Sequence, residues 1–192
     1  MVNIVSLRER LIGMFYRAAT GSRKMRNLLT PAGAVFFFGL IALFIFAALQ
    51  VDKFLDFPKL LPTALNIIVS APILAIGLFL MAWSVLHFVR VKGTPVPFNP
   101  PPKLVTIGPY ARVRNPMLTG VFVLLFGLGV LLRSISLVSI FTPLFILLNV
   151  LELKAVEERE LERRLGKDYV EYKKRVPMFI PRLKVGTKKS IK

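Results

Sequence analysis

The chain has 192 residues, of which 55% are hydrophobic and 19% are charged, and it carries a formal net charge of +17. The hydrophobic residues are concentrated in long uncharged blocks, which excludes the mixed composition of a soluble core. The chain has one histidine and no cysteine. This excludes disulfides, cysteine lipidation, ordinary zinc sites and Cys–His chemistry.

Four uncharged segments predict membrane-spanning helices, because a hydrocarbon core of about 30 Å needs roughly 20 apolar residues in a helix. They are residues 32–51, 60–89, 118–132 and 135–151. The last two are short and are separated only by Arg133 and Ser134, which predicts a tight helical hairpin. The expected fold class is therefore all-α, a polytopic integral membrane protein with about four transmembrane helices.

The basic residues lie on alternate sides of these spans, as the positive-inside rule expects. Six lysines and arginines precede the first span, five lie in the 90–117 loop, and 13 follow the fourth span. Both termini and the 90–117 loop are therefore assigned to the cytoplasm, in the cell inner membrane or the endoplasmic reticulum according to the organism. Anionic lipid headgroups explain this charge better than nucleic acid does.

Residues 1–31 form a basic segment in which apolar residues recur at helical spacing from Ile4 to Ala18. This pattern predicts an amphipathic helix that lies in the cytoplasmic membrane interface. A solvated basic tail is the alternative. The apolar patch at residues 11–15 is too short for a signal peptide. Residues 32–89 then hold the first two spans.

Residues 90–183 are expected to form the functional region. It begins with GTPVPFNPPP, residues 93–102, whose five prolines exclude a helix and predict a stiff strap at the membrane surface. After the fourth span the helical signal continues through residues 152–165, where Glu160 and Arg164 have the spacing of an i,i+4 ion pair.

Gly166 is the predicted end of that helix, because glycine is the favoured residue just past a helix C-terminus. A second short helix is predicted for residues 167–175. Residues 184–192 form a basic tail that is expected to be disordered. There is no phosphate-binding loop, and the GLG at residues 127–129 lies inside a span rather than after a strand, so it is not a dinucleotide fingerprint.

Two polar clusters remain as candidates for a site. The first comprises Tyr110, Arg112, Arg114 and Asn115, and the second comprises Glu157, Glu158 and Arg159. Because the third and fourth spans form a hairpin, both clusters leave the membrane on the same side and are expected to meet in one pocket. Pro116 suits the first turn of a helix that Asn115 caps, and the free N–H groups of such a helix favour an anion.

The segment KLVTIGPYARVRNPMLTG, followed by EERELERRLGKDYVEYKKRVPMFIP, resembles the isoprenylcysteine carboxyl methyltransferase family, which is related to the phospholipid N-methyltransferases. The resemblance covers roughly residues 93–181 and is greatest to prokaryote-like members. It implies methyl transfer from S-adenosylmethionine to a lipophilic acceptor, with the cofactor at the cytoplasmic ends of the last spans.

Carried over position by position, the resemblance implies cofactor contacts and two catalytic residues. The cofactor contacts are Lys103, Leu104, Val105, Tyr110, Asn115, Pro116, Met117, Leu118 and Glu157, and the catalytic residues are Arg114 and Glu158. Glu157 is expected on the ribose hydroxyls or the adenine side, and Arg114 on the carboxylate of the cofactor or an anion of the acceptor. Glu158 is the candidate base for an amine acceptor, whereas a carboxylate acceptor needs no base.

Three positions depart from the eukaryotic pattern. Asn115 stands where those enzymes carry histidine, Leu118 replaces a common tyrosine, and Leu153 stands where they place an arginine assigned to the substrate. The third departure weakens the case for a prenylcysteine carboxylate as the acceptor but does not remove it. Two classes of acceptor stay open: an isoprenylcysteine carboxylate, and a lipid amine or carboxylate.

Structural roles compete with the functional ones. Arg112 and Arg114 could serve only to keep their loop on the cytoplasmic side of the membrane through their charge. The acidic pair Glu157 and Glu158 could lie on a solvated helix face, and Tyr169 and Tyr172 could be packing residues. His87 with Trp83 suits a satisfied interfacial pair, and Asn149 suits either interhelical contact or a cavity wall. Two other function classes stay open: an NADPH-dependent membrane reductase of steroid-reductase-like fold, and a non-catalytic protein that binds anionic lipid.

Overall fold

The structure, a computed structural model, describes residues 4–90 and 104–182. Within them it consists of helices and loops, with no strand, which confirms the all-α fold class. The helices are α1 (Ile4–Thr20), α2 (Arg23–Phe54), α3 (Thr63–Arg90), α4 (Pro116–Leu131), α5 (Thr142–Glu152), α6 (Glu158–Leu165) and α7 (Lys167–Arg175). A 3₁₀ turn, η1 (Gly108–Ala111), precedes α4. Two π turns, η2 (Leu137–Phe141) and η3 (Leu153–Glu157), flank α5.

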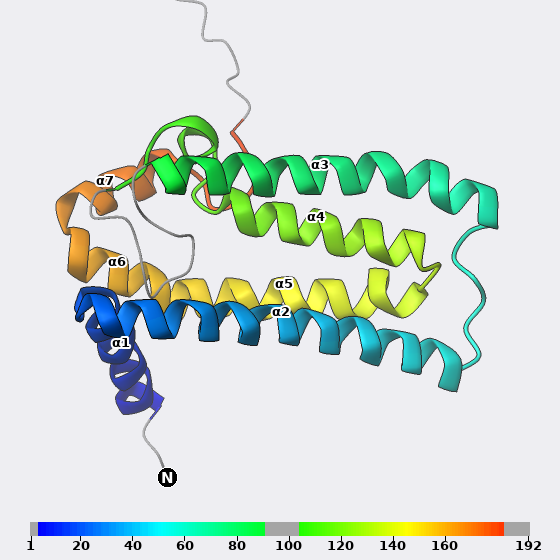
Figure 1. Ribbon diagram of the computed structural model, residues 1–192, viewed down its shortest axis with the longest axis horizontal. Helices are drawn as coiled ribbons and strands as arrows, with labels where there is room; N and C mark the ends of the chain where they lie inside the picture. The colour runs from blue at the N-terminus through cyan, green and yellow to red at the C-terminus, as the bar shows by residue number, and fades with distance from the viewer. Residues whose placement is uncertain (1–3, 91–103, 183–192) are drawn as a thin grey trace, which may run out of the picture.

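Three of the described helices are long and apolar enough to cross a membrane: α2, α3 and the continuous helix Leu137–Leu165, which comprises η2, α5, η3 and α6. The fourth apolar helix, α4, has 16 residues. At about 1.5 Å per residue it is roughly 24 Å long, and it lies along α3 in the bundle (Figure 1). The prediction of a hairpin after the loop is confirmed, because α4 turns back at Arg133, whose φ is 58°.

α2 begins at Arg23 rather than at residue 32, because Ser22 caps its N-terminus by accepting a hydrogen bond from the amide of Met25 at 3.3 Å. The predicted 1–31 segment is therefore divided between α1 and the first turns of α2. α1 is helical as expected, but Ile12, Ala18 and Ala19 are buried within the protein. These residues of α1 pack on the protein rather than facing the membrane interface.

α3 and α4 approach closely because glycines face each other. A Cβ on Gly77 would lie 2.9 Å from the amide nitrogen of Leu124, and one on Gly120 would lie 2.9 Å from the carbonyl oxygen of Gly77. Beside this pair, Phe122 and Phe145 pack edge to face in the hydrophobic core, with ring centroids 6.2 Å apart. Backbones in direct contact leave little freedom, so α3 and α4 form the rigid side of the bundle.

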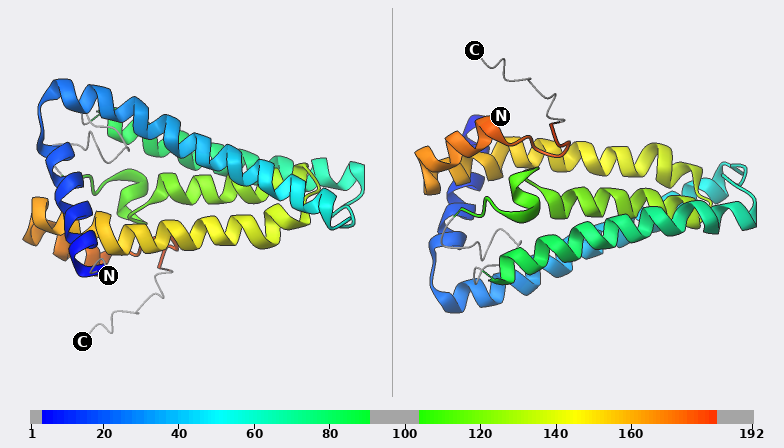
Figure 2. Two further views of the ribbon diagram at one scale, coloured as in Figure 1. Left: turned by 90° about the horizontal axis from the view of Figure 1, so that it is seen from below. Right: turned by 90° about the horizontal axis from the view of Figure 1, so that it is seen from above.

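A polar cluster joins the loops at the end of the bundle that is distant from α1. Asp52 accepts hydrogen bonds from the Ser134 hydroxyl and from the amide of Ser136, the latter at 2.9 Å. The Arg133 guanidinium donates to the carbonyl oxygen of Leu61 at 2.6 Å. α2 lies against η2 at this end and separates from α5 toward the other end, where α1 crosses between α2 and α6 (Figure 2).

Candidate active site at one end of the bundle

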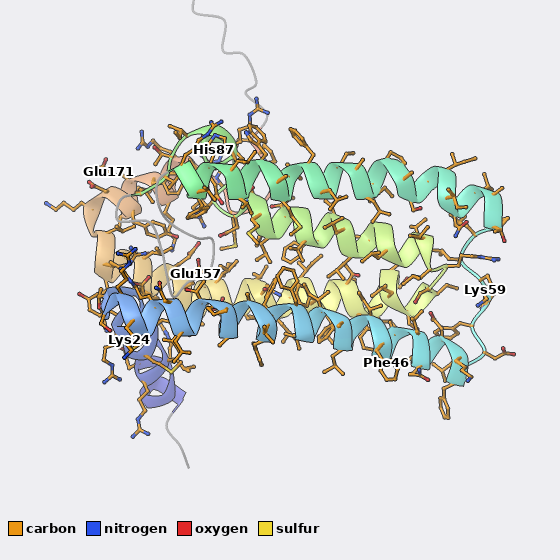
Figure 3. The ribbon with its side chains drawn as sticks, in the orientation of Figure 1. Lys24, Phe46, Lys59, His87, Glu157 and Glu171 are labelled. Carbon is orange, nitrogen blue, oxygen red and sulfur yellow. The ribbon has the colours of Figure 1, made fainter. Side chains whose placement is uncertain are left out.

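A cavity of about 510 Å³ lies at the end of the bundle where α1, α6 and α7 gather. Figure 3 labels Glu157, Lys24 and His87 at this end and Lys59 at the opposite end. The walls come from α1, α2, α3, residues 104–121 with the start of α4, α5, η3, α6 and α7. The predicted convergence holds for part of the two polar clusters, since Tyr110, Arg114 and Asn115 line the same cavity as Glu157. The other members, Arg112, Glu158 and Arg159, do not line it.

The GPYARVRNP turn forms one wall. Gly108 has φ +61°, and a Cβ there would lie 2.2 Å from Nε2 of His87, so the turn requires glycine. Tyr110 is buried, and its ring packs edge to face on Phe88 with centroids 5.0 Å apart. Burial raises the pKa of the Tyr110 phenol far above its usual value, so this ring is neutral in the wall.

Arg114 is the central cation of the site. Its Nη1 donates to the carbonyl oxygens of Val176 at 2.8 Å and Lys173 at 3.0 Å, and its Nη2 is paired with Glu158. Only 10% of the Arg114 side chain and 5% of the Glu158 side chain are exposed. The Nε of Arg114 is buried and has no hydrogen-bond partner among the described residues, although the residue lines the cavity.

The two members of the acidic pair have different surroundings. Glu158 does not line the cavity, because its carboxylate is held by Arg114 and by Lys173, whose Nζ lies 2.6 Å from Oε2. Burial lowers the pKa of Lys173, but its hydrogen bonds to Glu158 and Glu162 outweigh this, so its pKa is raised and it stays charged. Both carboxylate oxygens of Glu158 are thus held by cations, which favours a positioning role over the predicted role of candidate base.

Glu157, in contrast, lines the cavity, and its carboxylate takes part in none of the ion pairs and hydrogen bonds of the described residues. Neighbouring residues of a helix point about 100° apart, and the π turn η3 sets which of the two faces the cavity, because its extra residue rotates the following side chains by about 100° relative to a regular α-helix. Glu152, one turn earlier, also lines the cavity. Glu160 is occupied by Arg164 at 2.8 Å, which confirms the predicted i,i+4 pair.

The PMFIP segment explains how the turn is held. The amide of Arg114 donates to the carbonyl oxygen of Pro177 at 2.8 Å, and that of Asn115 donates to Met178 at 3.1 Å. Asn115 occupies the predicted N-cap position of α4, but its side chain makes no capping hydrogen bond. Asn115 also lines the cavity.

The predicted cofactor contacts, together with Arg114, fall into three groups according to where the structure places them. Those that line the cavity are Leu104, Val105, Tyr110, Arg114, Asn115, Met117, Leu118 and Glu157. Pro116 is fully buried at the first position of α4 and does not line the cavity. Lys103, the whole proline-rich strap at residues 93–102 and the 184–192 tail lie outside the described residues.

Sequence reasoning missed the apolar wall that α2 contributes. The lining residues of α2 are Gly33, Ala34, Phe36, Phe37, Phe38 and Leu40. The three consecutive phenylalanines at residues 36–38 could have indicated an apolar wall, but within an uncharged span they are equally typical of a surface that faces lipid. Asn149 also lines the cavity while it donates to the carbonyl oxygen of Phe145 at 2.8 Å, so it is a wall residue.

The structural alternatives agree with the contacts of several residues, of which Arg112, Trp83 and His87 do not line the cavity and Tyr172 does. Arg112 is exposed and lies over the Trp83 ring at 5.9 Å, and His87 Nδ1 lies 2.8 Å from the carbonyl oxygen of Trp83. These three residues form an interfacial cluster. Tyr172 is a packing residue, because its buried hydroxyl donates to the carbonyl oxygen of Tyr110 at 2.7 Å.

The fold and site define a helical membrane-type protein with a cavity that is polar at its loop end and apolar along α2. Residues 65–168 match the phospholipid methyltransferase family. The chain belongs to this family, which includes the isoprenylcysteine carboxyl methyltransferase-like group.

Among curated proteins, the chain is similar to the nickel-cobalt-cadmium resistance protein NccN of Alcaligenes xylosoxydans xylosoxydans. The two are 32% identical over 122 residues, which is 60% of this chain and 53% of NccN. The chain thus spans about half the length of the curated relative it matches. No solved structure matches the chain.

Proposed function

We propose that the protein is an S-adenosylmethionine-dependent membrane methyltransferase that acts on a lipophilic acceptor. Membership of the phospholipid methyltransferase family supports methyl transfer. The observation that carries the proposal is the composition of the cavity. Its loop end has an unpaired carboxylate and an unpartnered guanidinium nitrogen, and its α2 wall is apolar.

The residues at the loop end fit this cofactor. A volume of about 510 Å³ is within the roughly 300–1,000 Å³ of small-ligand sites. The free carboxylate of Glu157 can accept hydrogen bonds from ribose hydroxyls or an adenine amine, and the Nε of Arg114 can donate to the cofactor carboxylate. Tyr110 offers an aromatic surface for the base.

When bound, the cofactor supplies an electrophilic methyl group on a sulfonium. The task of the chain is then to align an acceptor lone pair with that group and to exclude water. The buried rings of Tyr110, Tyr169 and Tyr172 provide a dry wall. The phenylalanines of α2 would hold an apolar tail, so that only the head of the acceptor reaches the polar end.

The acceptor class follows from the groups that face the cavity. A carboxylate acceptor needs no base, whereas an amine acceptor needs one. Glu152 and Glu157 are the lining carboxylates without a cationic partner among the described residues, and they take the role predicted for Glu158. Either acceptor remains within the proposal, and Arg114 would serve an anionic head.

We also propose that the cavity opens toward the cytoplasm and that α4 is the fourth transmembrane helix. The end with α1 and the start of α2 carries Arg8, Arg10, Arg17, Arg23 and Lys24, whereas acids accompany the basic residues of the opposite end. By the positive-inside rule the basic end is cytoplasmic, where the soluble cofactor is available. Anionic headgroups would then contact the basic residues around the site.

The test is ligand binding followed by methyl transfer. Purified full-length protein in lipid nanodiscs is titrated calorimetrically with S-adenosylhomocysteine and, separately, with NADPH. It is then incubated with labelled methyl donor and either total membrane lipid or prenylcysteine analogues, and the products are identified by mass spectrometry. We expect binding of S-adenosylhomocysteine and a labelled lipophilic product.

Two outcomes would overturn the proposal. Binding of NADPH without S-adenosylhomocysteine would favour a membrane reductase. Folded protein that binds neither ligand but binds vesicles containing anionic lipid would favour a non-catalytic lipid-binding protein.

A further inference from the structure

α1 contacts the helix that carries Glu157. It packs on α6 and on the π turn η3 (Figure 2). Phe15 of α1 lines the cavity. Two polar contacts join α1 to η3 and α6. The Nε of Arg8 donates to the carbonyl oxygen of Ala155 at 3.2 Å, and Glu9 pairs with Arg163 at 3.2 Å. An N-terminal helix is thereby tied to the helix that follows α5.

Arg8 contacts the π turn η3, which sets the directions of the Glu157 and Glu158 side chains. Ala155 lies within the π turn Leu153–Glu157, two residues before Glu157. A π turn interrupts the regular i→i−4 hydrogen-bond ladder at the cost of local helix stability. A charged donor from outside that binds a carbonyl of this turn stabilises the π form relative to the regular α-helix.

The two helix forms have different consequences for the site. In the π form, Glu157 lines the cavity while Glu158 is paired with Arg114. Removing the extra residue from the turn would rotate the following side chains by about 100°, and both carboxylates could not keep these positions. The direction of Glu157 therefore depends on the π turn that Arg8 contacts.

We infer that Arg8 is a positioning residue for the candidate active site and that α1 is part of that site rather than only a membrane anchor. Arg8 acts through the carbonyl of Ala155 and the η3 turn on Glu157, which would contact the cofactor. This inference rests on the proposed function, because it assigns the effect of Arg8 to cofactor binding.

A pair of matched variants tests the inference in the full-length protein in nanodiscs. Arg8→Gln removes the charged donor, and Arg10→Gln removes the same charge from an exposed arginine of α1 that has no hydrogen bond or ion pair to another described element. Arg8→Lys keeps a cationic donor. The measurements are the affinity for S-adenosylhomocysteine, hydrogen exchange of the 153–158 amides, and the KM values for cofactor and acceptor.

We expect Arg8→Gln to weaken S-adenosylhomocysteine binding by roughly three- to tenfold, the effect of one partly exposed hydrogen bond from a charged donor. The KM for the cofactor should rise while the KM for the acceptor is unchanged, and the 153–158 amides should exchange faster. Arg8→Lys should restore most of the affinity. Arg10→Gln should match the wild type in all measurements.

Equal behaviour of Arg8→Gln and Arg10→Gln would overturn the inference, as would a lowered melting temperature of Arg8→Gln with unchanged affinity and exchange. If Arg8→Gln detaches α1, a second test uses the other contact, the ion pair between Glu9 and Arg163. The double variant Glu9→Arg with Arg163→Glu exchanges the two charges and keeps the pair, so it should bind S-adenosylhomocysteine more tightly than either single variant. Failure of the double variant to exceed the single ones would also count against the inference. A wild-type protein that binds no S-adenosylhomocysteine refutes the proposed function instead, so the two failures are distinguishable.

Discussion

The hydroxyl of Tyr172 donates a hydrogen bond to the carbonyl oxygen of Tyr110 at 2.7 Å, and both residues are buried in the cavity wall. This bond joins α7 to the turn η1 across 62 residues of sequence. Burial raises the pKa of the Tyr172 phenol well above its usual value, so the donor proton is present at every working pH. The shape of the turn therefore depends on a C-terminal helix.

The first prediction concerns this hydrogen bond. Tyr172→Phe leaves a buried carbonyl without its donor, and we expect it to lower the unfolding free energy by about 1–3 kcal/mol. Unfolding in mixed detergent micelles measures the effect. Tyr169→Phe is the matched control, because Tyr169 is buried on the same helix but its hydroxyl donates no hydrogen bond among the described residues. Equal losses in the two variants would contradict the assignment.

The second prediction concerns Glu157 as the cofactor contact. Glu157→Gln should weaken S-adenosylhomocysteine binding by roughly 10- to 100-fold, because a hydrogen bond to a charged group contributes about 1.5–3 kcal/mol. The melting temperature should hold, since Glu157 is in no ion pair of the described residues. Glu171→Gln removes the same charge from the exposed face of α7 (Figure 3) and should bind normally. Unchanged affinity in Glu157→Gln would refute this role.

The third prediction separates positioning from base catalysis at Glu158. Because Glu158 is buried and keeps only Lys173 as a cationic partner once Arg114 is removed, Arg114→Ala should lower the unfolding free energy by about 1.5–3 kcal/mol, the contribution of a hydrogen bond to a charged group. Glu158→Gln should also destabilise the protein. The double variant should lose less than the sum of the two single losses, as residues in direct contact do.

Methylation measured across pH decides the role of Glu158. A positioning residue changes cofactor affinity in Glu158→Gln but leaves the shape of the pH–rate profile. The loss of an ionisation from that profile, with cofactor affinity intact, would restore Glu158 as the base.

The fourth prediction concerns the rigid side of the bundle. Gly77→Ala places a methyl group within 3.0 Å of backbone atoms on α4, and overpacking of this kind costs about 1–3 kcal/mol. Gly39→Ala is the control, because nothing lies within 4 Å of a Cβ at that position of α2. It should leave stability unchanged or raise it by up to about 1 kcal/mol through helix propensity. Unfolding free energies that do not distinguish the two variants would argue against the close α3–α4 approach.

Several predictions from local pattern agree with the structure because they depend on neighbouring residues alone. α7 covers the predicted residues 167–175, and Gly166 ends α6 with φ +60°. The Glu160–Arg164 pair forms at the spacing of one helical turn. α2 contains the predicted span but begins earlier, at Arg23, because hydrophobicity marks a span and not the position at which the Ser22 cap starts the helix.

The all-helical class, the uncharged segments, the hairpin near Arg133 and the two polar clusters could be predicted from the amino-acid sequence, because apolar length, turn residues and charge are local properties of the chain. The folded arrangement was needed to see that Glu157 lines the cavity while Glu158 pairs with Arg114, and that α1 and α2 supply walls. The physical reason is that a π turn rotates every later side chain, and that the contacts of Arg8 and of the α2 phenylalanines join segments far apart in sequence. No periodicity within one segment encodes either effect.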